Sequence, residues 1–145
     1  MRTKTVLCAV DVSNSDVDIG VLRKAQEMAN LEEAQLDVIT VVPDYGMSVV
    51  GQFFDDSHHE KVVAEAQARL ASLVTEALGA KANKEARHIV ATGNAYEAIL
   101  KAADADDANL IVIGAHKPEF ADYLLGPNAA RVVRHSKCSV FVVRD

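Results

Sequence analysis

Leu-Ile-Val-Ile-Gly, residues 110–114, is the stretch that decides the fold. It is short, uniformly apolar and rich in β-branched residues, which is typical of a strand buried on both faces of a parallel sheet. Gly114 ends this run, and Gly126 opens a helix that we expect to continue over residues 128–135. A strand that ends in glycine and feeds a helix can present free backbone N–H groups to an anion. The C-terminal third is therefore the first candidate for a binding site.

Further apolar runs on either side of this stretch predict strands at residues 5–10, 36–42, 86–92 and 139–143. Apolar residues at helical spacing predict helices along residues 21–29, 60–78 and 95–103. Strands and helices thus alternate, and right-handed crossovers between them favour a parallel, doubly wound α/β sheet. We expect the run at 109–114 to be a central strand. Ligands bind such sheets beyond the carboxyl ends of the strands, so the loops after the first, second and fourth strands are where a site is expected.

Composition limits both the architecture and the partners. The chain has 145 residues, half of them apolar, which fits one domain over residues 1–145. Its net charge of −6 would repel a nucleic-acid backbone. No apolar run approaches the ~18 residues of a membrane helix, and the amino terminus shows no signal-peptide pattern, so we expect a cytoplasmic protein without membrane or nucleic-acid partners. Cys8 and Cys138 lie in or beside predicted strands, where lone thiols usually belong to the core.

The sequence lacks the motifs of several well-known classes of protein. The turn after the first strand has no glycine, so a dinucleotide fingerprint is excluded, and neither a Walker A nor a Gly-x-Ser-x-Gly motif occurs. A phosphoacceptor receiver would share the expected fold, but it needs an acidic cluster where only Asp11 directly follows the first strand. His58 and His59 are adjacent, which places them about 100° apart on a helix. Because no acidic or cysteine partner recurs at ligand spacing, we expect no metal site.

Four motifs carry a resemblance to a known family. They are Val-Asp-x-Ser at 10–13, Ile-Val-Ile-Gly at 111–114, Tyr-Leu-Leu-Gly-x-Asn-Ala-Ala at 123–130, and Val-Val-Arg-His-x-x-Cys-Ser-Val at 132–140. Together they resemble the universal stress protein family, and Ala-His-Lys-Pro at 115–118 is similar to its subgroup with His-Arg-Pro at that place. The resemblance implies a flavodoxin-like, adenine-nucleotide-hydrolase-like three-layer sandwich with a five-stranded parallel sheet in the order 3-2-1-4-5. It also implies a domain that usually dimerises and often holds ATP.

The resemblance assigns a role to each candidate site residue. Ala9 and Asp11 would border adenine and ribose, Val41 would meet the adenine edge through its backbone, and Ile113 and Gly114 would line the sugar side. Gly126, Pro127 and Asn128 would approach the phosphates. His116 lies between these segments and could either contact a nucleotide or cap the loop.

Two departures from the family pattern affect the phosphate end. The family places Gly, two residues, Gly, nine residues, Gly and then Ser or Thr, whereas here Lys117 stands at the second glycine and Pro127 at the hydroxyl residue. A lysine could meet a phosphate as a point charge or remain a solvated loop residue. Proline suits a helix start without any ligand, but it removes an N–H and a hydroxyl. Losing one charge-assisted hydrogen bond would weaken binding roughly ten- to a hundred-fold, and Asn128 could supply a replacement donor.

The sequence supports two main functional hypotheses. The first is a universal stress protein that binds ATP, or ADP or AMP, as a regulatory or protective module, with Mg²⁺ bound only through the nucleotide. Without a recognisable trio of nucleophile, base and metal, it is not expected to be an enzyme beyond slow ATP hydrolysis or autophosphorylation. The second is a nucleotide-free member that acts through dimerisation and protein partners. A receiver or flavoprotein of the same fold is a third, less favoured reading.

A homodimer is expected from the last apolar run. Residues 139–143 come at the chain end and should form an edge strand, which must be covered or paired. The predicted contact therefore consists of Ser139, Val140, Phe141, Val142 and Val143.

Overall fold

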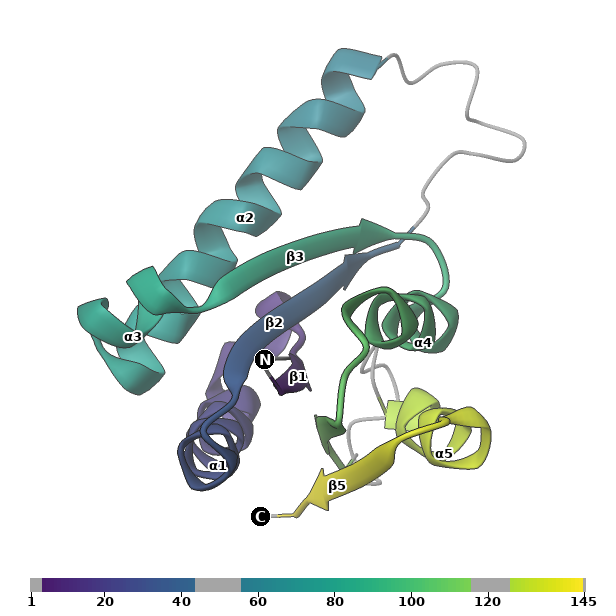
Figure 1. Ribbon diagram of the computed structural model, residues 1–145. Helices are drawn as coiled ribbons and strands as arrows, with labels where there is room; N and C mark the ends of the chain where they lie inside the picture. The colour runs from purple at the N-terminus through teal and green to yellow at the C-terminus, as the bar shows by residue number, and fades with distance from the viewer. Residues whose placement is uncertain (1–3, 44–55, 116–125, 145) are drawn as a thin grey trace.

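The structure is a computed structural model that describes residues 4–43, 56–115 and 126–144 (Figure 1). Strands β1 (Thr5–Ala9), β2 (Gln35–Val42), β3 (Arg87–Thr92), β4 (Leu110–Gly114) and β5 (Ser139–Val143) alternate with helices. The helices are α1 (Ser15–Glu32), α2 (Asp56–Leu78), α3 (Ala80–Glu85), α4 (Ala95–Asp106) and α5 (Gly126–His135), and a 3-10 turn, η1 (Val12–Asn14), precedes α1. Among these helices, none combines the length and apolar character of a membrane-spanning segment.

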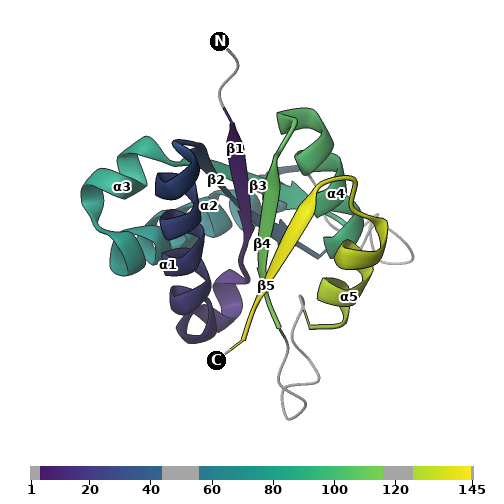
Figure 2. The same ribbon diagram turned by 60° about the horizontal axis from the view of Figure 1, so that its bottom comes forward.

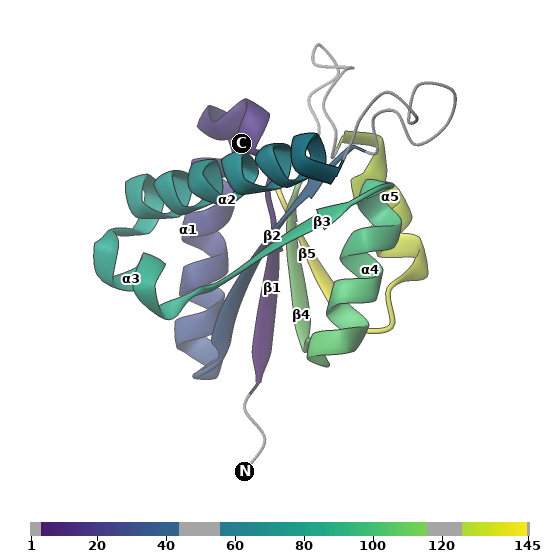
Figure 3. The ribbon, with the colours of Figure 1, turned by 90° about the horizontal axis from the view of Figure 1, so that it is seen from above.

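The described strands form one parallel five-stranded sheet in the order β3-β2-β1-β4-β5. Helices α1 and α2 cover one face, with α3 beside α2, while α4 and α5 cover the other (Figures 2 and 3). This confirms the expected three-layer α/β fold and its strand order. The middle position belongs to β1, and β4, which was expected to be central, lies beside it between β1 and β5.

Two apolar clusters, one on each face of the sheet, make up the core. On β1, Val6 and Cys8 pack with the α1 and α2 side, whereas Leu7 and Ala9 pack with the α4 and α5 side. Both sets are at most 1% exposed. A strand that is buried on both faces has no polar side to alternate with, which explains the uniformly apolar runs in the sequence.

Two helix ends are set by a capping side chain and by a glycine with positive φ. Asn94 caps α4, because its Oδ1 accepts a hydrogen bond from the backbone N–H of Glu97 at 3.4 Å. Gly79, with φ of 99°, ends α2 and leads directly into α3, a helix that was not predicted from the sequence. The reason is that α3 has no buried residue, so it leaves no apolar periodicity to detect.

Candidate functional site

In this fold a ligand site is expected where the sheet changes its winding direction. Strands β1 and β4 are neighbours, yet α1 follows β1 on one face and α5 follows β4 on the other. Their parallel register places Ala9 beside Ile113, and Ala9 is also opposite Ile39, two residues before Val41. The ends of β1, β2 and β4 therefore meet at one edge of the sheet, which is the usual ligand position in doubly wound folds.

Asp11 is held in place by its own loop. Its carboxylate Oδ1 accepts hydrogen bonds from the backbone N–H of Ser13 at 3.0 Å and from the Ser13 hydroxyl at 2.5 Å. The backbone N–H of Asp11 donates to Oδ2 of Asp18 at 2.6 Å. Only 6% of Asp11 is exposed. A carboxylate fixed in this way loses little conformational entropy when it binds a ligand hydroxyl.

A cavity of about 430 Å³ opens beside Asp11. One wall comes from the ends of β1 and β2, and the other comes from α2; the lining residues are Asp11, Val12, Ser13, Thr40, Val41, Val42, Pro43, Val62, Glu65, Ala66 and Arg69. Its volume falls within the range of about 300–1,000 Å³ that is usual for small-molecule sites. Walls of mixed polar and apolar character, with the fixed carboxylate of Asp11, suit a flat, partly apolar ligand that carries hydroxyl groups.

The residues of α2 that line this cavity were not predicted from the sequence. Glu65 and Arg69 form an ion pair of 2.7 Å at helical i,i+4 spacing, and both side chains are more than half exposed. Such a pair looks in the sequence like an ordinary solvated helix face. Only the packing of α2 beside the end of β2 makes these residues part of the cavity.

The predicted site residues on β1 and β4 have different surroundings. Ala9 and Ile113 are 1% and 0% exposed, and their side chains belong to the core rather than to the lining of the cavity. Gly114 packs closely against α1. A Cβ atom there would lie 3.0 Å from Cγ2 of Val21 and 3.7 Å from Oδ1 of Asp18. The glycine thus permits the close approach of α1 to β4.

Gly114→Val is expected to destabilise the fold by about 1–3 kcal/mol through overpacking, and Gly114→Ala by less. The physical reason is the 3.0 Å contact with Val21, which must move aside. Urea unfolding of the two variants beside the parent protein measures this. Equal stability of all three proteins would contradict the assigned role of Gly114.

Asn128 connects two helices of the same sheet face. Its side-chain Oδ1 accepts a hydrogen bond from the backbone N–H of Tyr96 in the first turn of α4, at 3.3 Å. Tyr96 also packs against α5, because Arg131 lies over its ring with 5.3 Å between the guanidinium carbon and the ring centroid. The amide oxygen of Asn128 is therefore already used in joining α4 to α5.

The phosphate end of the predicted site is described only in part. Helix α5 begins at Gly126, as expected, and Pro127 is its second residue. His116 and Lys117 lie outside the described residues. Within the described parts of the chain, no group of three His, Cys, Asp or Glu side chains could hold a metal ion.

Known proteins of similar sequence identify the family of the chain. A model of the universal stress protein family matches residues 2–144. The chain is 28% identical over 143 residues to Universal stress protein G of Salmonella typhimurium, covering 97% of this chain and 99% of that protein.

Solved structures share the fold. The protein MJ0577 superposes with a TM-score of 0.75 at 20% identity, over 100% of this chain and 98% of that one. The universal stress protein from Archaeoglobus fulgidus, solved in complex with dAMP, has a TM-score of 0.67 at 24% identity, over 98% of each chain. The chain belongs to the universal stress protein family.

Proposed function

We propose that this protein binds an adenine nucleotide at the carboxyl ends of β1 and β2 and acts as a regulatory or protective module. The observation that carries the proposal is the cavity of about 430 Å³ in which Asp11 and Val41 come together. The Asp11 carboxylate, oriented by Ser13, can accept hydrogen bonds from ribose hydroxyls. The backbone of Val41 can meet the adenine edge. Binding of dAMP by the Archaeoglobus fulgidus relative supports the choice of an adenine nucleotide.

The phosphates would extend toward the start of α5. The N-terminus of a ten-residue helix carries unsatisfied N–H groups and a partial positive charge. In the proposal, Gly126, Pro127 and Asn128 approach the phosphates, with His116 and Lys117 beside them, and Mg²⁺ enters only with the nucleotide. Because Pro127 offers no N–H, we expect weaker phosphate binding than the family pattern would provide.

Calorimetric titration with ATP, ADP and AMP tests the proposal. We expect binding heat for at least one of them and none for GTP at equal concentration, because guanine presents a different hydrogen-bonding edge. No heat at millimolar adenine nucleotide would overturn nucleotide binding. Any ATP hydrolysis should be slow, because no trio of nucleophile, base and metal is recognisable in the sequence.

The β5 edge supports the competing proposal of action through dimerisation. Within the described sheet β5 pairs only with β4, and Val140, Phe141, Val142 and Val143 are all partly exposed. A partly apolar strand with an open edge is a template for pairing with a second copy. Native mass spectrometry of freshly purified protein separates the proposals, because a co-purified mass of nucleotide size supports the first one.

Val140→Asp or Val142→Asp is expected to convert the proposed dimer into monomers, because a charge beside the strand edge disfavours pairing. Light scattering measures the mass, and circular dichroism checks that the fold persists. Val133→Asp is the matched control, since Val133 is 51% exposed on α5 and outside β5. An unchanged dimer mass in both folded β5 variants would refute this edge as the contact.

A further inference from the structure

Asp37 is an acidic residue in the interior of the sheet, far from the proposed nucleotide site. It lies near the amino end of β2, opposite Leu7 of β1 and Arg87 of β3. Its exposed fraction is 0%. Ile39 and Val41, which alternate with it along β2, belong to the cluster beneath α4 and α5. A carboxyl group therefore stands where the pattern of the strand calls for an apolar side chain.

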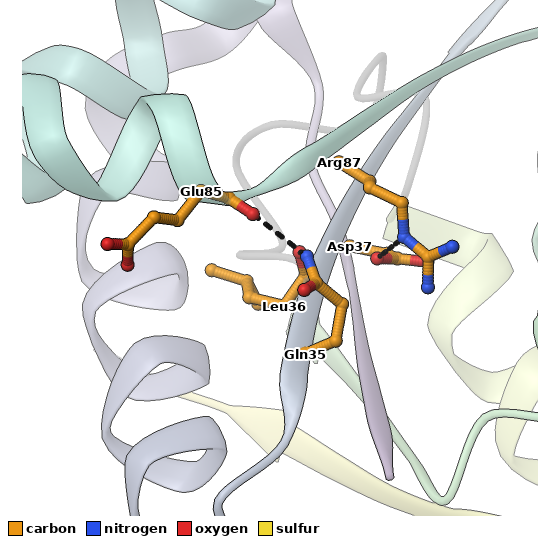
Figure 4. Close-up of polar contacts among 5 residues, drawn as sticks. All are labelled: Gln35, Leu36, Asp37, Glu85 and Arg87. Atoms are coloured by element: carbon orange, nitrogen blue, oxygen red, sulfur yellow. Dashed lines mark hydrogen bonds and ion pairs between the residues drawn. The ribbon is translucent and has the colours of Figure 1, made fainter. Parts of the chain in front are cut away.

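Arg87 satisfies one oxygen of this carboxyl. Its Nε donates to Oδ1 of Asp37 at 2.9 Å, as Figure 4 shows, while its own side chain remains 60% exposed. The nearby Gln35 does not contribute a donor to this pair. Its Nε2 donates instead to the backbone carbonyl oxygens of Leu36 and Glu85, at 2.9 and 3.0 Å.

A second carboxyl group, that of Asp106, interacts with the side chain of Asp37. Oδ2 of Asp37 and Oδ2 of Asp106 are both buried, and among the described residues neither has a donor. Asp106 is the last residue of α4, which packs on β2. An ionised carboxylate can only accept hydrogen bonds, so two carboxylates side by side leave both oxygens unsatisfied. A single proton between them would satisfy both.

The electrostatic environment favours that proton. Burial raises the pKa of Asp37 to about 7, and the hydrogen bond and negative charge of Asp106 add to the rise, whereas Arg87 opposes it. These two residues supply the charges that act on Asp37, one from α4 and one from β3, while β1 places only the apolar Leu7 beside it. One partly exposed guanidinium does not balance two desolvated carboxylates.

We propose that Asp37 and Asp106 bind one shared proton in the folded protein, and that this proton stabilises the contact between the C-terminal end of α4 and β2. The unfolded chain holds no such proton above its ordinary Asp pKa, near pH 4. Between about pH 4 and pH 7 the folded state therefore binds one proton more than the unfolded state, and its stability rises as the pH falls. Above about pH 7 the proton leaves, and the contact carries two like charges.

Urea unfolding between about pH 5 and 8 tests this proposal with Asp37→Asn, Asp106→Asn and the parent protein. In the parent, this site should change the unfolding equilibrium constant by about tenfold per pH unit between pH 5 and 6.5. Either asparagine supplies a permanent N–H donor, so no proton has to bind at this site. In each variant, the pH dependence of unfolding should therefore correspond to about one proton fewer than in the parent. The contributions of other titrating groups cancel in the difference between parent and variant.

Asp104→Asn is the matched control, because Asp104 is 60% exposed on the same helix and pairs only loosely with Lys137, at 3.8 Å. It should keep the parental slope. A parental slope in both Asp37→Asn and Asp106→Asn would overturn the proposal. So would stabilisation by Ca²⁺ that disappears in either variant, since a cation would then occupy the place of the proton.

Infrared spectroscopy of the folded parent gives an independent measure should one variant fail to fold. A protonated-carboxyl band is expected at about pH 6 and should be absent at about pH 9. Its absence at both values would contradict a shared proton. The result does not depend on nucleotide binding, because the pair lies at the opposite end of β2 from the proposed site.

Discussion

Leu7→Ala is expected to lower the free energy of unfolding by about 2–5 kcal/mol. Leu7 is 0% exposed on the middle strand β1, where it packs in the cluster beneath α4 and α5. Removing its side chain leaves a cavity that strands on both sides prevent from collapsing. Since domains of this size are stable by about 5–15 kcal/mol, the loss is a large part of the total. Urea unfolding monitored by circular dichroism measures it.

Leu31→Ala is the matched control for this prediction. It deletes the same atoms from a leucine on α1 that is 75% exposed, so its effect should stay within about 0.5 kcal/mol. Similar losses in the two variants would show that β1 is not the rigid centre of the core. A near-zero effect at Leu7 alone would contradict the tight packing between β1 and α4.

Asp11→Ala is expected to weaken adenine-nucleotide binding roughly ten- to a hundred-fold, as the loss of about one charge-assisted hydrogen bond predicts. The reason is that Asp11 is the carboxylate that the β1 end holds toward the cavity, fixed by Ser13 at 2.5 Å. Asp11→Asn should fall between the parent and the alanine variant, because the amide oxygen can still accept from Ser13 without the negative charge. Calorimetric titration measures both affinities.

Asp104→Ala controls for the loss of a carboxylate elsewhere. It removes an exposed acid near the end of α4 that lies outside the cavity. We expect its nucleotide affinity to equal that of the parent protein. If Asp11→Ala binds as tightly as this control while the parent binds well, Asp11 is not a ligand of the nucleotide.

The part of the candidate site that lies at the carboxyl ends of the strands could be predicted from the sequence. Asp11 and Val41 follow or end apolar runs, and parallel strands bring such positions to one edge. Glu65 and Arg69 were not predictable, because their spacing is that of a solvated pair. Asp18 was also missed, although it is 5% exposed and bonded to the backbone of Asp11. In the sequence it is one of several polar residues at the start of a helix.

For Asp37, inside the core, the sequence likewise did not reveal the contact partner. A lone acid in the apolar run of residues 36–42 was a visible irregularity, but it did not reveal a partner. Its neighbour Asp106 is far away in the chain and ends a helix, where an acid is ordinary at the surface. The pairing depends on how α4 is rotated against the sheet.

By itself, the sequence determined the fold class, the strand order through family resemblance, and the strand ends that carry Asp11 and Val41. These follow from side-chain periodicity and from turn residues, which are local properties of the chain. Only the tertiary structure decided that α2 walls the cavity, that Gly114 admits α1, and that Asp37 meets Asp106. Such contacts join elements distant in sequence, and they are set by register and helix rotation, which no local pattern records.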